Sequence, residues 1–253
     1  MQTRIEGHSL PVLTVYLDAW ETLISETGEL SWKSPNVALS TTLSGGGQTG
    51  FMGAVKRSLG GGGLFMTEYR AEAAPGYVAF AAKMPGGIVE HRIDPGRSVL
   101  VHRHGFLCGS AGITLGLGFQ RSLGAGIFGG DGFRLTQVSG DGTFFAVLGG
   151  HVVSNVLQPG EQIDVHPGHV GMFEDSVGFD ITMLPGLRNK LFGGDGFFMA
   201  RLTGPGRVWL QTLTLPNLAH ALAPYLGGET VGASAEGAAL GATASSLLRK
   251  VFE

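Results

Sequence analysis

Apolar and polar residues alternate over short stretches of this chain, which is the pattern of β-strands with one buried face. The alternation is clear at residues 12–17 and 88–93. Pro-Gly, Asp-Gly and Gly-Gly pairs separate such stretches and mark turns. No segment before residue 216 keeps a helical period, and the dense Pro and Gly would break helices. The pattern therefore predicts an all-β fold of jelly-roll type, built from short strands.

Two sequence elements recur three times along the chain. The first is an aliphatic residue, a turn and an alternating strand, found at residues 17–28, 93–104 and 157–168. The second is a Gly-rich run that leads into an apolar strand, found at residues 60–67, 129–136 and 193–200. A further turn and strand follow each copy of the second element. We therefore predict three tandem β-sandwich repeats, at residues 3–74, 75–140 and 141–214, packed as one compact unit.

The chain from residue 215 onward has a different composition. Residues 216–224 have the pattern of a short helical turn, whereas residues 227–246 are rich in Gly, Ala, Ser and Thr. Residues 247–253 fit an amphipathic terminal turn. Two interpretations of the Gly/Ala-rich tail at 215–253 stand side by side: a flexible linker, or a short helical tail that docks onto a neighbouring subunit.

The composition excludes a disordered chain and points to surface buried between subunits. Hydrophobic residues make up 43% of the 253 residues, whereas disordered chains have low apolar content and high charge. Charged residues make up only 15%, against roughly 25% in soluble domains. A monomer with so few charges would expose uncharged surface to water. We therefore expect part of that surface to be buried between copies of the chain.

Charge and cysteine content bear on the partner and the compartment. The net charge of −3 gives no general attraction to nucleic acid, although residues 56–134 carry nine basic and five acidic side chains, net +4. Cys108 is the single cysteine, so no internal disulfide forms, and its apolar neighbours predict a buried side chain. The first 13 residues lack a basic-then-apolar leader. We expect a cytoplasmic location and leave contact with a membrane open.

Two histidines give the clearest candidate metal site. Gly96, His102 and His104 match the opening of the cupin metal motif, and alternation along a strand would place both imidazoles on one face. That motif needs a Glu four or five residues later, where this chain has Cys108 and Gly109. The later His-then-Asn element of the motif is also missing. We expect surface or hydrogen-bonded histidines here and keep the metal site as an alternative.

The remaining candidate groups predict turns rather than chemistry. His166 and His169 flank a Pro-Gly turn with no acidic or cysteine partner beside them in a known pattern. Gly-rich runs such as residues 60–63 precede strands, whereas a phosphate loop needs a following helix. Asp131 and Asp195 stand between glycines, as turn-forming residues do. We therefore assign no catalytic residue, no cofactor and no metal, and we expect no enzyme activity.

The residues that carry a family resemblance lie in the second and third repeats and in the Gly-rich run before them. Residues 193–198 and 203–212 resemble the C-terminal motif of the mitochondrial-biogenesis family called altered inheritance of mitochondria 24. Residues 62–66, with residues 85–89 downstream, are similar to the central motif of the same family. The resemblance covers about residues 3–215, and so nearly the full chain.

The resemblance implies an architecture. Bacterial members of the family resemble the trp RNA-binding attenuation protein in fold, with three β-sandwich repeats per chain and three chains in a ring. The family has no established catalytic residues, and its eukaryotic member acts as a scaffold in mitochondrial inner-membrane organisation. We therefore expect a non-enzymatic structural or interaction protein that forms a homotrimeric β-ring and whose further protein partner is unknown. The alternatives are an RNA-binding ring protein and a cupin-like metal-dependent enzyme that uses His102 and His104.

Overall fold

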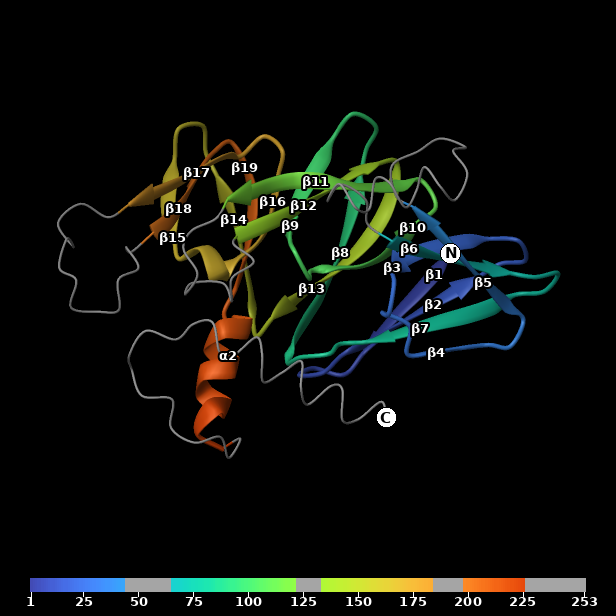
Figure 1. Ribbon diagram of the computed structural model, residues 1–253. Coiled ribbons are helices and arrows are strands. Elements are labelled where there is room, and N and C mark those ends of the chain that lie inside the picture. The colour runs from blue at the N-terminus through green and yellow to red at the C-terminus, as the bar shows by residue number, and fades with distance from the viewer. Residues whose placement is uncertain (44–64, 122–132, 184–197, 226–253) are drawn as a thin grey trace.

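The computed structural model describes residues 1–43, 65–121, 133–183 and 198–225. Within these ranges the regular secondary structure is mostly β-strand, arranged in four antiparallel sheets (Figure 1). The predicted all-β fold is confirmed. The predicted burial of Cys108 is confirmed as well, because its side chain is fully enclosed.

The four sheets lie in sequence from the N-terminus to the C-terminus. The N-terminal sheet has the strand order β1 (Gln2–Glu6), β2 (Val12–Leu17), β7 (Gly76–Ala81) and β4 (Trp32–Lys33). The first shared sheet has the order β5 (Val37–Leu43), β6 (Phe65–Ala71), β3 (Thr22–Glu26), β10 (Phe106–Ser110), β13 (Gly142–Gly149) and β8 (Gly86–Ile93). The second shared sheet has the order β11 (Ile113–Arg121), β12 (Phe133–Gly140), β9 (Ser98–His102), β16 (Val170–Glu174), β19 (Gly206–Gln211) and β14 (Val152–Leu157). The C-terminal sheet has the order β15 (Gln162–Val165), β18 (Phe198–Thr203) and β17 (Gly178–Met183).

One pattern of strand pairing recurs in three modules, which we define as module 1 (β2–β7), module 2 (β8–β13) and module 3 (β14–β19). In each module the first strand pairs with the sixth and the sixth with the third. The second strand pairs with the fifth and the fifth with the fourth. The predicted limits 3–74 and 75–140 separate β7 from β2 and β13 from β8, with which these strands pair. The pairing therefore places the last strand of each of these modules after the predicted limit.

Neighbouring modules are joined through their sheets. The third strand of module 2, β10, pairs with the second strand of module 1, β3. The third strand of module 3, β16, pairs in the same way with the second strand of module 2, β9. Each shared sheet is therefore built half from one module and half from the next.

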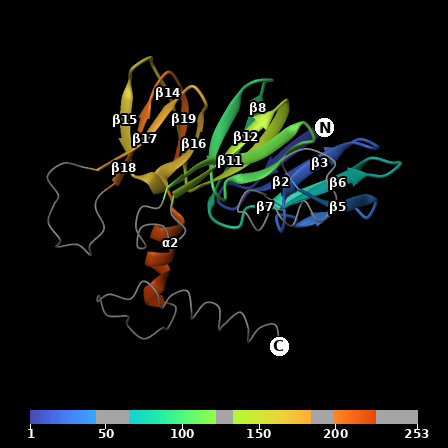
Figure 2. The ribbon, with the colours of Figure 1, turned by 45° about the horizontal axis from the view of Figure 1, so that its top comes forward.

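Three hydrophobic cores lie between successive sheets. Figure 2 shows the sheets from the one with β2 and β7 to the one with β15, β17 and β18. We call the three cores core 1, core 2 and core 3, and at their centres lie Phe80, Phe144 and Phe173 respectively. Each of the first two cores also receives an aromatic side chain from the module that follows. Phe145 of module 2 belongs to core 1, and Trp209 of module 3 belongs to core 2. The modules are therefore not independent, because modules 2 and 3 each complete the core of the module before them.

A short helix, α2 (Leu215–Leu222), follows the last strand and points away from the sheets (Figures 1 and 2). Its N-terminus is capped by Thr214, whose hydroxyl accepts a hydrogen bond from the Asn217 N–H at 3.2 Å. A turn of 3-10 helix, Ala223–Tyr225, continues it. The helical turn predicted at 216–224 is confirmed, while the Gly/Ala-rich part of the predicted tail lies outside the described residues. Within the described ranges, no helix has the length and apolar character needed to cross a membrane.

Two glycines in left-handed backbone conformations offer a test of the turns. Gly96 has φ +81° and open space around it, while Gly140 has φ +116° and would place a methyl group against the backbone oxygen of Gly112. We expect Gly96→Ala to lower the free energy of unfolding by about 1 kcal/mol, because only the backbone conformation is strained. Gly140→Ala should cost about 3 kcal/mol, since the clash adds to the strain. Urea denaturation at matched protein concentration measures both, and equal losses would contradict the described packing at Gly140.

Candidate functional site

Two edge strands, β4 of the N-terminal sheet and β15 of the C-terminal sheet, are of special interest because their counterparts in the other modules pair with each other. In the described part of the chain, β4 has a strand partner on one side only, β7, and β15 likewise pairs only with β18. Strand β4 is the third strand of module 1, and β15 is the second strand of module 3. At both internal junctions, a third strand and a second strand pair with each other. The two ends of the chain therefore carry complementary halves of the same junction.

The strand register shows which residues of the third strands correspond. Each correspondence is set by the residue directly opposite on the sixth strand. The opposed pairs are Trp32 with Ala79, Cys108 with Phe145, and Met172 with Trp209. Trp32 therefore occupies in module 1 the position of Cys108 in module 2 and Met172 in module 3.

The second strands correspond in the same way through their partners on the fifth strands. The opposed pairs are Ser25 with Thr67, Val101 with Thr136, and Val165 with Ala200. At the internal junctions, Cys108 lies opposite Ser25 and Met172 lies opposite Val101. By the same register, Trp32 and Val165 are the corresponding residues at the two open edges.

The residues at the two open edges are more exposed to solvent than the corresponding residues at the internal junctions. Cys108, Met172, Ser25 and Val101 are all 0% exposed. Trp32 is 49% exposed, and Val165 is half-buried. Large apolar side chains are thus left in contact with water at positions where both internal junctions are sealed.

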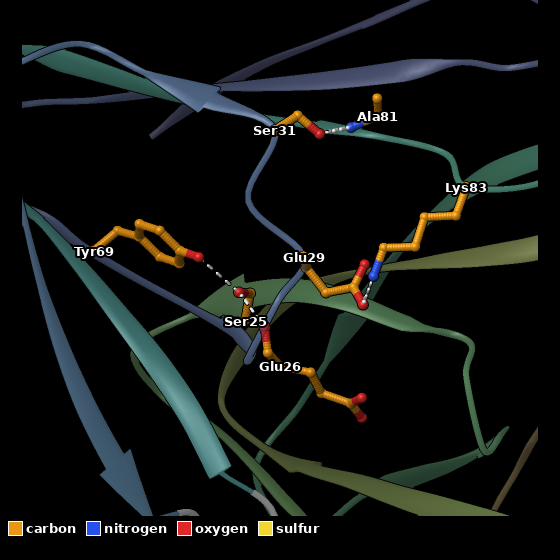
Figure 3. A network of polar contacts seen from close by, with 7 residues as sticks. All are labelled: Ser25, Glu26, Glu29, Ser31, Tyr69, Ala81 and Lys83. Carbon is orange, nitrogen blue, oxygen red and sulfur yellow. Dashed lines mark hydrogen bonds and ion pairs between the residues drawn. The ribbon is translucent and has the colours of Figure 1, made fainter. Parts of the chain in front are cut away.

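A network of polar groups lies where β3 ends, beside the first internal junction (Figure 3). The Ser25 hydroxyl hydrogen-bonds the Tyr69 hydroxyl at 3.2 Å, and the Glu29 carboxylate forms an ion pair with the Lys83 ammonium at 2.6 Å. The Glu26 side chain extends away from these groups (Figure 3), and its Oε1 is buried with no hydrogen-bond partner among the described residues. Burial, reinforced by the nearby charge of Glu29, raises the pKa of Glu26 to about 7. This carboxyl group therefore changes its charge near neutral pH.

A cavity of about 310 Å³ adjoins this network, at the small end of the range for ligand pockets. The Glu29–Lys83 ion pair forms part of its wall. Most of the other side chains that line it are apolar: Ala81, Ala82, Met84, Phe106, Leu107, Val147 and Leu215. The arrangement offers one ion pair, an apolar wall and two histidines, His102 and His104.

The two histidines of the candidate metal motif do not lie on one face of a strand. Strand β9 ends at His102, and the chain then turns, with the Gly105 N–H bonded to the His102 carbonyl at 2.8 Å. The His102 Nε2–H donates to the Val147 carbonyl at 3.1 Å, and burial lowers the pKa of His102 to about 4. His104 is exposed. The expectation that both imidazoles share a strand face is wrong, because the strand stops too early.

The second histidine pair lies at a short 3-10 turn, η1 (Pro167–His169). The His166 Nδ1 accepts a hydrogen bond from the Gly168 N–H, and the His169 Nδ1–H donates to the Gln211 carbonyl at 2.7 Å. Among the described residues, no group of three His, Cys, Asp or Glu side chains is placed to hold a metal ion. Asp131, Asp195 and the Gly-rich runs lie outside the described residues.

Sequence reasoning missed Trp32 and Val165, the residues that mark the open edges. Strand β4 has only two residues, too few to show alternation, and β15 has four. The spacing of the recurring first element was the one sequence signal that could have identified Val165. Val101 and Val165 are both in the recurring first element, so Val165 is a counterpart of a core residue that can be recognised from the sequence.

Replacement of Glu26 by glutamine tests the buried carboxyl. Its pKa rises from 4.5 to about 7 on folding. The folded state therefore binds more protons than the unfolded state between about pH 4.5 and 7, and the contribution of Glu26 to stability falls as pH rises through this window. We expect Glu26→Gln to be nearly neutral near pH 4 and to raise the free energy of unfolding by about 2–3 kcal/mol near pH 8. Urea denaturation at both pH values measures this, with the exposed Glu90→Gln as control; a difference independent of pH would refute the assignment.

Comparisons with known proteins agree with this architecture. The chain is similar to protein SPYM3_0169 from Streptococcus pyogenes, whose crystal structure matches with a TM-score of 0.69 at 23% sequence identity. The match covers 89% of this chain and 99% of the streptococcal one, and shows a shared fold. A search of curated proteins found no match. The sequence model of the family described as Mitochondrial biogenesis AIM24 matches residues 3–213. The chain therefore belongs to the Mitochondrial biogenesis AIM24 family.

Proposed function

We propose that this protein is a non-enzymatic interaction protein whose chains associate head to tail, edge β4 of one chain on edge β15 of the next, into a closed homotrimeric ring. The observation that supports this most strongly is the pair of open edges. A third strand without a second strand ends one sheet, and a second strand without a third strand ends another.

Unpaired strand edges favour association because their backbone N–H and C=O groups are free to bond another chain. The internal junctions β3–β10 and β9–β16 supply a template for how these edges join. Pairing of β15 with β4 of a second copy would assemble a sheet with the strand order of the shared sheets and with β1 added beside β2. Such a head-to-tail contact is heterologous, and it becomes finite when the rotation between copies closes a ring.

The number of chains follows from the family resemblance, which implies three repeats per chain and three chains per ring. The low content of charged residues, 15%, also supports burial of surface between copies. The function of the ring is then to present surfaces of nine modules to a partner rather than to transform a substrate.

Two arginines of the mildly basic middle segment are engaged by carboxylates, which does not favour RNA binding. Arg92 is ion-paired with Asp141 at 2.6 Å, and Arg97 is ion-paired with Asp175 at 2.9 Å. A phosphate backbone would have to compete with these carboxylates. The cupin-like alternative likewise gains no support, because the Nε2 of His102 is engaged by a backbone carbonyl.

The ring is tested by mass and by a charge placed on one edge. Sedimentation equilibrium at micromolar concentration should give three times the chain mass of 26.3 kDa. Val165→Lys should weaken association tenfold or more, by roughly the cost of placing a charge on a pairing edge. Val153→Lys, at an exposed valine of β14, is the matched control and should leave the mass unchanged. Far-ultraviolet circular dichroism verifies folding. A wild-type protein that sediments as a single chain would overturn the proposal.

A further inference from the structure

We infer that the Trp32 side chain of one chain packs into core 3 of the next chain. This contact would make the junction between two chains different from the internal junctions within a chain. This rests on the proposed head-to-tail ring and names the residues that would make its interface specific. The partner is a second copy of this chain.

At the register position of Trp32, the other two third strands carry a residue that belongs to the core of the preceding module. Cys108, in β10 of module 2, belongs to core 1, and Met172, in β16 of module 3, belongs to core 2. Trp32 holds the same register position in module 1 and lies on the face of the N-terminal sheet that faces away from core 1, opposite Ala79. Pairing of β4 with β15 in the proposed ring places Trp32 opposite Val165, so the core that Trp32 would enter is core 3 of another copy.

In module 1 the large and the small residue of the opposed pair have exchanged strands, compared with modules 2 and 3. At the internal junctions a Cys or Met on the third strand lies opposite an aromatic on the sixth, as in the pairs Cys108–Phe145 and Met172–Trp209. In module 1 the aromatic is Trp32 on the third strand, and the small residue is Ala79 on the sixth. Each pair still supplies one aromatic ring to the preceding core, but at a different position in the sheet.

Core 3 is less completely covered than core 2 along its second strand, and a side chain such as Trp32 would cover this part. Its second-strand residues Ile163 and Val165 are only partly buried. The corresponding residues of module 2, Val99 and Val101, are 2% and 0% exposed. Core 3 is thus open along the edge where core 2 is sealed by Met172 and Trp209.

Charge provides a second difference between the two kinds of joint. If Trp32 of one chain lies opposite Val165 of the next chain, the following residue, Lys33, lies opposite Asp164 of that next chain. The same positions at the internal junctions pair Gly109 with Ile24 and Phe173 with Leu100, which are uncharged. Asp164 already binds Arg201 through two hydrogen bonds of 2.8 and 2.9 Å, and the hydrogen bonds from Arg201 lower its pKa. Lys33 would add a second cation to a carboxylate that stays ionised.

Tryptophan fluorescence reports the contact directly, because the three tryptophans have different surroundings. Trp209 is buried and Trp20 is exposed, so a Trp20→Phe background leaves Trp32 as the residue whose environment changes on association. Over a dilution series of this variant, we expect the emission to shift to shorter wavelength as chains associate. Quenching by acrylamide should fall severalfold over the same concentrations.

Substitutions separate a role in association from a role in folding. Trp32→Ala should weaken association about thirtyfold, as expected for removal of a tryptophan at the centre of an interface. Trp20→Ala removes a similarly exposed tryptophan and should leave association unchanged. The double variant Trp32→Met/Ala79→Trp copies the Met172–Trp209 pair and should restore much of the lost affinity.

Disulfide trapping tests the register without altering Trp32. Oxidation of the double variant Lys33→Cys/Asp164→Cys should link chains covalently, because directly opposed residues lie within reach of a disulfide. The shifted pair Lys33→Cys/Gln162→Cys is the control and should link poorly, and the native Cys108 is buried. A trimer whose Trp32 stays fully quenchable, or which links only in the shifted register, would overturn this inference and leave the ring intact. A protein that remains a single chain at all concentrations would overturn both.

Discussion

Backbone hydrogen bonds between the second strand of one module and the third strand of the next hold the two shared sheets together, and most other features of the fold follow from them. A module supplies only half of each shared sheet, and cores 1 and 2 are sealed by residues from the following module. Phe145 and Trp209 illustrate this, since both are carried by one module and buried in the core of another. An architecture of this kind leaves unfinished sheets at its two ends.

The sequence predicts the class of fold and the helix after the last strand, because these depend on local patterns. Alternation identifies β2, and the Pro and Asn residues after Thr214 mark the start of α2. It does not reveal which strands pair across modules, because that pairing joins residues far apart in the chain. Phe144 and Phe145 hold a partial clue: two adjacent buried aromatics belong to a strand that is covered on both faces, here by cores 2 and 1.

The candidate chemistry was harder to predict than the fold, for a physical reason. His102 and His104 have a spacing that suits one face of a strand, but the turn closed by the Gly105 N–H ends β9 between them. Whether a strand continues for two more residues depends on its neighbours and not on the spacing of the histidines. Glu26 was not predicted either, because a lone carboxylate gives no indication in sequence that one oxygen will be enclosed without a partner.

The shortness of β4, two residues against the four of β15, has a consequence for how an assembly of these chains would behave over time. So short a contact makes each individual joint easy to open. In a closed ring, however, a chain is released only when both of its joints are open together, and a joint that opens alone recloses quickly because its two halves stay tethered at high local concentration. Cyclic closure would thus turn weak joints into a long-lived particle, while an unclosed row of the same chains would shed subunits from its ends.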